Sequence, residues 1–166
     1  MKAQAFTLEG VMASLLLLIV VYTFFQSSLV ISPMWSELSD AQLRLLAQDT
    51  LKILDNPDKV DGNYINATLQ GMISQLNSSF EPNPEFLYAL DRVTFPANYR
   101  LELYWVEGGG INGTAIVDND PTPEAVGGSR FVVIEKDDLS SDSPFKNNPE
   151  ISDPVVFEVR LILWRP

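Results

Sequence analysis

The sequence predicts an α+β protein in which a long, membrane-spanning N-terminal α-helix precedes a head made of a second helix packed on an antiparallel β-sheet. Three observations lead to this prediction. An apolar run without a charged residue covers residues 10–31, apolar residues take three-and-four spacing after Pro33, and polar and apolar residues alternate after Val93. We therefore expect two parts: residues 1–33, a short leader and hydrophobic helix, and residues 34–166, a head.

The apolar run has the length of a membrane span. Its roughly 22 residues would extend about 33 Å as a helix, close to the ~30 Å hydrocarbon core of a bilayer. A secretory signal peptide has a shorter apolar core and a small-x-small cleavage site, whereas this run ends at Ile31-Ser32-Pro33. Only Lys2 and the terminal amine supply positive charge before it, which predicts a cytoplasmic N-terminus and a head outside the cell.

The amphipathic segment after Pro33 predicts a helix with one buried face. Ser32 can cap its start, so it is either continuous with the first helix or kinked at Pro33, and Asn56-Pro57 ends it. The predicted buried face consists of Leu43, Leu46, Ala47, Thr50, Ile53 and Leu54. A second helix is predicted from about Tyr64 to Leu76, with Ile65, Leu69, Met72, Ile73 and Leu76 on its buried side.

Alternation with a period of two predicts four strands in the rest of the head. They cover residues 99–105, 114–117, 130–134 and 155–164, and a glycine-rich turn at 108–113 joins the first two. One face of the resulting antiparallel sheet can bury itself on the amphipathic helix. The polar stretch from Asp137 to Asp153 predicts a long surface loop.

Composition argues against catalysis and against nucleic-acid binding. The net charge is −11, with 22 acidic and 11 basic residues, which repels phosphate backbones. Histidine and cysteine are absent, so we expect no enzyme activity, no cofactor and no metal site. Two acidic loops are the weaker alternative, as calcium ligands or as an acidic pair of a hydrolase: one holds Asp118 and Asp120, the other Asp137, Asp138 and Asp142.

The N-terminus carries a resemblance to a known family. Ala5-Phe6-Thr7-Leu8-Glu9 follows a very short basic leader and precedes the long apolar run, and small residues interleave with bulky ones, which favours close helix packing. This segment, together with the closing stretch 155–165, resembles archaeal type IV pilin-like proteins. The resemblance implies that a prepilin peptidase removes the leader, either between Gln4 and Ala5 or between Ala5 and Phe6. The first cut makes Glu9 the fifth residue of the mature chain.

The resemblance also implies an assembly. Phe6, Thr7, Leu8 and Glu9 would lie at subunit contacts, with Glu9 paired to a neighbour's new amine and the apolar helix forming the filament core. The partners would be other copies in a helical homopolymer, the cell membrane before assembly, the prepilin peptidase and the assembly machinery. The expected function is thus a structural subunit of an adhesive cell-surface filament. The alternative is a permanently anchored single-span protein whose head binds a ligand or partner without polymerising.

Three Asn-x-Ser/Thr sequences are candidate glycosylation sites on an outward-facing head. They begin at Asn66, Asn77 and Asn112. We expect Asn112 to be the best placed, on an exposed turn, and Asn66 to be shielded within the second helix.

Overall fold

The computed structural model describes the backbone of residues 2–166 and the side chains of residues 9–23 and 38–166. The chain divides into two compact units, Met1–Ser39 and Asp40–Pro166. Helix α1, Lys2–Leu54, contributes its first part to one unit and its last turns to the other, and its backbone is helical through Pro33. The second unit is the head.

The prediction of a membrane-spanning helix is wrong. Among the residues that the structure describes, no helix is both long enough and apolar enough to cross a membrane. The described side chains of the apolar run cover residues 10–23. Residues 24–31 of that run lie outside the described side chains.

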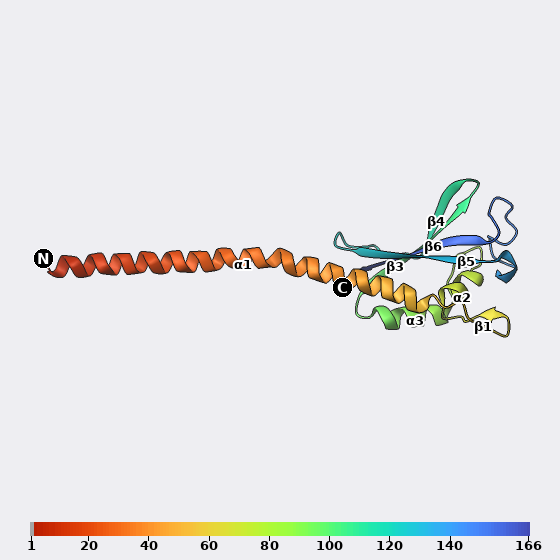
Figure 1. Ribbon diagram of the computed structural model, residues 1–166, viewed down its shortest axis with the longest axis horizontal. Coiled ribbons are helices and arrows are strands. Elements are labelled where there is room, and N and C mark those ends of the chain that lie inside the picture. Colours follow the sequence, from red (N-terminus) through yellow and green to blue (C-terminus); the bar gives the residue numbers. More distant parts are fainter. Residues whose placement is uncertain (1) are drawn as a thin grey trace. The chain divides into compact units, whose positions relative to one another are not determined.

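The head contains a four-stranded antiparallel sheet (Figure 1). Its strands are β3 (Asn98–Glu107), β4 (Gly110–Val117), β5 (Val126–Ile134) and β6 (Val155–Trp164), in the order β4-β3-β6-β5. Each of the four predicted strands lies within one of them, although β4 and β5 begin four residues earlier than predicted. The expected glycine-rich turn is tighter, because Gly108 and Gly109 alone take up the positive φ angles of the β3–β4 hairpin.

The register places the large apolar residues of the two central strands on one face. Leu103 pairs with Val159 and Trp105 with Phe157, and buried residues of β6 alternate with exposed or half-buried ones from Val155 to Leu163. The last turns of α1, α2 (Leu69–Ser74) and α3 (Pro84–Thr94) lie on one side of the sheet (Figure 1). The core therefore lies between this helical layer and the sheet.

The buried face of α1 differs from the prediction at one position. Ala47, Thr50, Leu51 and Leu54 are buried, whereas Ile53 is 66% exposed. The spacing of three, one and three residues keeps the four buried positions on one side, and Ile53 lies about 100° from Leu54 around the helix. Leu51, at four residues from Ala47, takes the place that the sequence pattern assigned to Ile53.

The second helix is much shorter than predicted. The expected start at Tyr64 falls in a small hairpin of β1 (Lys59–Val60) and β2 (Asn63–Tyr64), whose turn residues Asp61 and Gly62 both have positive φ. Thr68 then caps α2, because its hydroxyl accepts a hydrogen bond from the Gly71 amide at 3.1 Å. Turn chemistry therefore delays the helix by five residues.

Helix α3 was not predicted, although the sequence carries its start signal. The Asn83 side chain accepts a hydrogen bond from the Phe86 amide at 2.7 Å, and Pro84 occupies the first turn. Phe86 and Leu90, four residues apart, are fully buried. An Asn-Pro-Glu opening followed by apolar residues at helical spacing would have identified it.

The segment between β5 and β6 is not the simple surface loop that was predicted. Leu139, Phe145 and Ile151 are buried, and a short 3-10 helix spans Lys136–Asp138. The Phe145 ring lies edge-on to Trp105 at 5.0 Å and to Phe157 at 4.9 Å. Polar composition therefore concealed three apolar anchors that fix this segment, residues 135–154, against the sheet.

We expect Phe145→Ala to lower the free energy of unfolding by about 3–5 kcal/mol, because it leaves a cavity beside two aromatic rings. Phe131→Ala is the matched control, since Phe131 is 67% exposed on the sheet, and it should change stability by about 0.5 kcal/mol or less. Denaturant unfolding followed by far-ultraviolet circular dichroism measures both. Equal effects of the two substitutions would contradict the anchoring role of Phe145.

Candidate functional site

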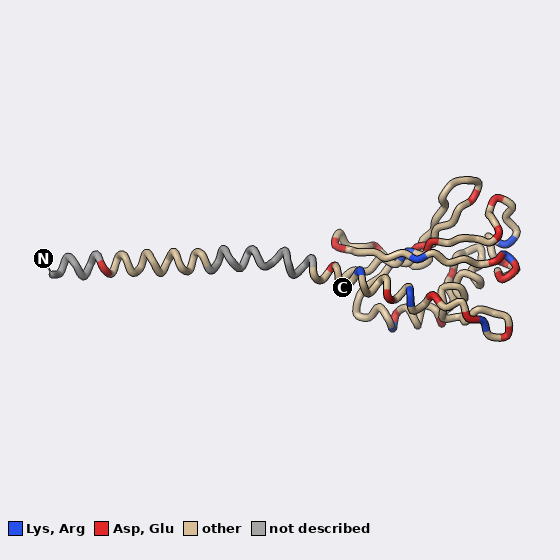
Figure 2. The backbone as a smooth tube through the Cα atoms, in the orientation of Figure 1, with Lys and Arg blue, Asp and Glu red and all other residues tan. Residues whose placement is uncertain are grey.

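The described N-terminal part of α1 exposes a continuous apolar surface. We call residues 11–22 the apolar segment. All of its large hydrophobic side chains are between 44% and 70% exposed: Val11, Met12, Leu15, Leu16, Leu17, Leu18, Ile19, Val20, Val21 and Tyr22. Figure 2 shows that no charged residue follows Glu9 within the described residues 10–23. Exposed apolar surface of this extent indicates an interaction site.

The polar side chains at this surface are compatible with burial. The Ser14 hydroxyl donates to the Val11 carbonyl at 2.8 Å, and the Thr23 hydroxyl donates to the Val20 carbonyl at 2.8 Å. Each of these two hydroxyls therefore has a hydrogen-bond partner within its own helix. Burial of the segment would leave neither donor without an acceptor. A Cβ built at Gly10 would meet no atom within 4 Å, which leaves room for close approach of another backbone.

The predicted processing and assembly residues fall mostly outside the described side chains. This holds for Gln4 and Ala5 at the predicted cut, and for Phe6, Thr7 and Leu8. Glu9 is described: it is exposed, and it forms no hydrogen bond or ion pair with another described residue. It lies two residues before the apolar segment, where its carboxylate is available to a partner.

The structure ranks the three glycosylation candidates differently from the sequence. Asn66 lies in a turn and not in a helix, but its side chain is half-buried and accepts from Gln75, and Thr68 of the same sequence is buried with its hydroxyl donated to Ile65. Asn112 lies within β4 and not in a turn, and its amide donates to Glu107 at 2.9 Å. Asn77 is half-buried like Asn66, but it lies in an irregular segment before two exposed serines, and its Nδ2 donates to no described residue.

We therefore expect Asn77 to be the most fully modified of the three asparagines and Asn66 the least. The reason is access, because modification needs a free amide nitrogen and an exposed hydroxyl residue two positions later. Glycopeptide mass spectrometry of the protein from its native host, with site occupancy quantified, measures this order. A higher occupancy at Asn66 than at Asn77 would contradict it.

The carboxylates of the two acidic loops do not gather into a cluster. No group of three or more acidic residues able to hold a metal ion occurs in the described part of the chain. In the first loop, the Asp118 carboxylate pairs with Arg100 at 2.6 Å, and the Asn119 amide donates to the Tyr99 carbonyl. In the second, Asp138 pairs with Lys59. The Asp118 and Asp138 carboxylates are therefore engaged in ion pairs within the head.

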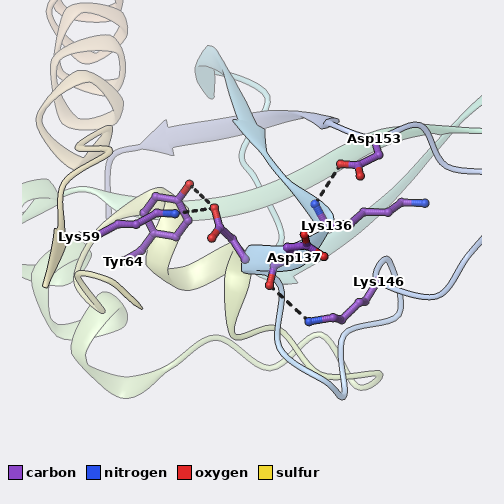
Figure 3. A network of polar contacts seen from close by, with 7 residues as sticks. Lys59, Tyr64, Lys136, Asp137, Lys146 and Asp153 are labelled. Atoms are coloured by element: carbon purple, nitrogen blue, oxygen red, sulfur yellow. Dashed lines mark hydrogen bonds and ion pairs between the residues drawn. The ribbon is translucent and has the colours of Figure 1, made fainter. Parts of the chain in front are cut away.

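One polar network joins the small hairpin to the segment before β6 (Figure 3). The Lys59 ammonium contacts the Asp138 carboxylate at 2.6 Å and lies 4.5 Å from the centre of the Tyr64 ring, while the Tyr64 hydroxyl donates to the same carboxylate at 3.1 Å. The hydrogen bond from Lys59, with a further one from Tyr64, holds the pKa of Asp138 below its ordinary value. The network therefore favours the ionised carboxylate in the folded state.

This lowered pKa predicts a loss of stability in acid. A carboxyl group with a lower pKa in the folded state contributes stability above its unfolded pKa, about 3.9, and that contribution disappears as the pH falls through the folded pKa. We expect Asp138→Asn to be less stable than wild type at neutral pH and to lose less stability between about pH 4 and pH 2. Urea unfolding across this range measures the difference. Asp142→Asn, at an exposed carboxylate nearby, is the control and should follow wild type.

Comparisons with known proteins identify relatives of this chain. The family model described as "Family of unknown function (DUF7288)" matches residues 2–159. A protein of Archaeoglobus fulgidus, described as uncharacterized, is 41% identical over 169 residues, which cover 99% of this chain and 93% of that protein. No solved structure matches the chain.

Proposed function

The chain belongs to the DUF7288 family, and we propose that it is a structural subunit of an archaeal pilus-like filament on the cell surface. Polymerisation through the apolar segment is the central element of the proposal. Cell adhesion is the role that the resemblance at the N-terminus implies for such a filament. The archaeal origin of the 41% identical relative agrees with the archaeal family that the N-terminus resembles.

The observation that carries the proposal is the distribution of apolar residues around α1. Residues 15–21 are seven consecutive large apolar residues, all exposed. At about 100° per residue they cover every side of the helix. A helix that is apolar on all sides needs neighbours on all sides, whereas a stripe on one side would suffice for a simple pair. Several copies packed around one another satisfy this requirement.

Packing of this kind leads to an open assembly. When two copies meet through different surfaces and the rotation between them does not close a ring, repetition of the contact gives a helical polymer. The free Glu9 carboxylate would then pair with a cationic group of a neighbour, for which the resemblance implies the amine created by leader removal. An ion pair removed from water fixes register more than it adds affinity, because the cost of desolvation offsets much of the attraction.

The anchored single-span alternative depends on a membrane-spanning helix, and the described residues contain none.

We expect Leu17→Glu to abolish filaments, because it places a charge at the centre of the apolar segment and removes a leucine whose burial in the filament would contribute about 1.5–3 kcal/mol per subunit. The measurement is electron microscopy and sedimentation of sheared cell-surface material from a host that expresses the full chain. Ile111→Glu is the control: Ile111 is also exposed, at 78%, but lies on the β3–β4 hairpin, and filaments should persist.

Glu9→Gln tests the ion pair separately. We expect fewer or shorter filaments from this variant, with the head folded as in wild type by circular dichroism. N-terminal sequencing of the sheared fraction would also locate the processing site. Filaments of normal amount and length from Leu17→Glu would overturn the proposal.

A further inference from the structure

The head contains a polar cleft beside the Lys59–Asp138 network. Its volume is about 390 Å³, within the range of small-molecule sites. We call it the polar cleft. Its lining comes from the small hairpin, the end of α2 and the 3-10 helix, and consists of Gly62, Asn63, Tyr64, Asn66, Ser74, Gln75, Asp137, Asp138, Leu139 and Ser140.

Hydrogen bonds fix the shape of the polar cleft. The Gln75 amide donates to the Asn66 side chain at 2.5 Å, and the Asn83 amide supports both by donating to the Gln75 side chain and to the Asn66 carbonyl. Across the cleft, the Ser140 amide donates to the Ser74 carbonyl at 2.8 Å, which ties the segment before β6 to α2. The walls are therefore held in place before any ligand arrives, and this lowers the entropic cost of binding.

Several polar groups in the cleft retain free hydrogen-bonding capacity. The side chains of Asn63 and Asp137 are exposed and form no hydrogen bond with another described residue. Asn66 and Gln75 use some of their amide donors and acceptors within the wall, and each amide has two donors and one acceptor. The cleft thus offers a ligand one carboxylate, which accepts hydrogen bonds, and several side-chain amides, which both donate and accept them.

The chemistry of the lining selects the class of ligand. No lysine or arginine lines the cleft, and Asp138 is already paired with Lys59, so an anion would find no countercharge. Leu139 is the one aliphatic side chain of the lining beyond the Tyr64 ring, so a hydrocarbon ligand would bury few contacts. Vicinal hydroxyl groups match the lining best, because each hydroxyl both donates and accepts a hydrogen bond.

We propose that the polar cleft binds an uncharged saccharide, with the Asp137 carboxylate accepting from ring hydroxyls and the Asn63, Asn66 and Gln75 amides completing the contacts. This site lies in the head and does not depend on the apolar segment. The saccharide site therefore goes beyond the proposed filament function, and either can fail without the other.

The test is saturation-transfer difference NMR on the full-length chain. The probes are the methyl glycosides of glucose, galactose, mannose and N-acetylglucosamine, with glucuronic acid and glucosamine as charged comparators. The method tolerates large particles, so filaments do not prevent it, and any detergent used must itself contain no sugar. We expect saturation transfer to at least one methyl glycoside in preference to both charged comparators.

Two variants assign the binding to the polar cleft. Asp137→Ala and Asn63→Ala should each weaken binding about tenfold or more, the effect of losing hydrogen bonds worth roughly 1.4 kcal/mol. Asp142→Ala, which removes an exposed carboxylate outside the cleft, should bind as wild type, and thermal unfolding checks that all three variants fold. The proposal is overturned by no transfer to any methyl glycoside, by preference for a charged comparator, or by binding that both cleft variants retain.

Discussion

The fold of the head depends on the burial of one face of β6. Val155, Phe157, Val159, Leu161 and Leu163 alternate along the strand and are each at most 1% exposed. With β3 and β5 paired on either side, this face lies at the centre of the sheet and must be covered. The last turns of α1, with α2 and α3, provide the cover and share one hydrophobic core with this face.

The same constraint organises the segment before β6. Phe145 fills the space beside Phe157, and polar contacts then hold the chain on either side of it. The Lys136 ammonium donates to the Asn148 and Ile151 carbonyls at 2.8 and 2.7 Å, and Glu107 at the end of β3 accepts from the Trp105 and Asn148 side chains. A segment without strands or long helices is in this way made rigid. One wall of the polar cleft is rigid for the same reason, because the 3-10 helix that forms it belongs to this segment.

The two units differ in how much of their apolar surface is buried. In the head, a continuous core buries the large side chains of three helices and four strands. In the apolar segment of α1, every large side chain is exposed, while the hydroxyls of Ser14 and Thr23 are satisfied within the helix. A surface of exposed apolar side chains is suited to association. The head thus has a core of its own, whereas the apolar segment presents its large side chains to solvent.

Local pattern alone determined the α+β content, the four strands and the exposed apolar run, because alternation and uninterrupted hydrophobicity are properties of neighbouring residues. The membrane span predicted from that run was wrong, because the described residues contain no helix able to cross a membrane. The start of the second helix was set by the Asp61-Gly62 turn and the Thr68 cap. Only the tertiary structure decided that Leu51 and not Ile53 faces the core, that Phe145 anchors a polar segment, and that Asn63 and Asp137 share one cleft. The physical reason is that burial and proximity between residues distant in sequence depend on which surfaces the packed sheet leaves open, and no local spacing contains that information.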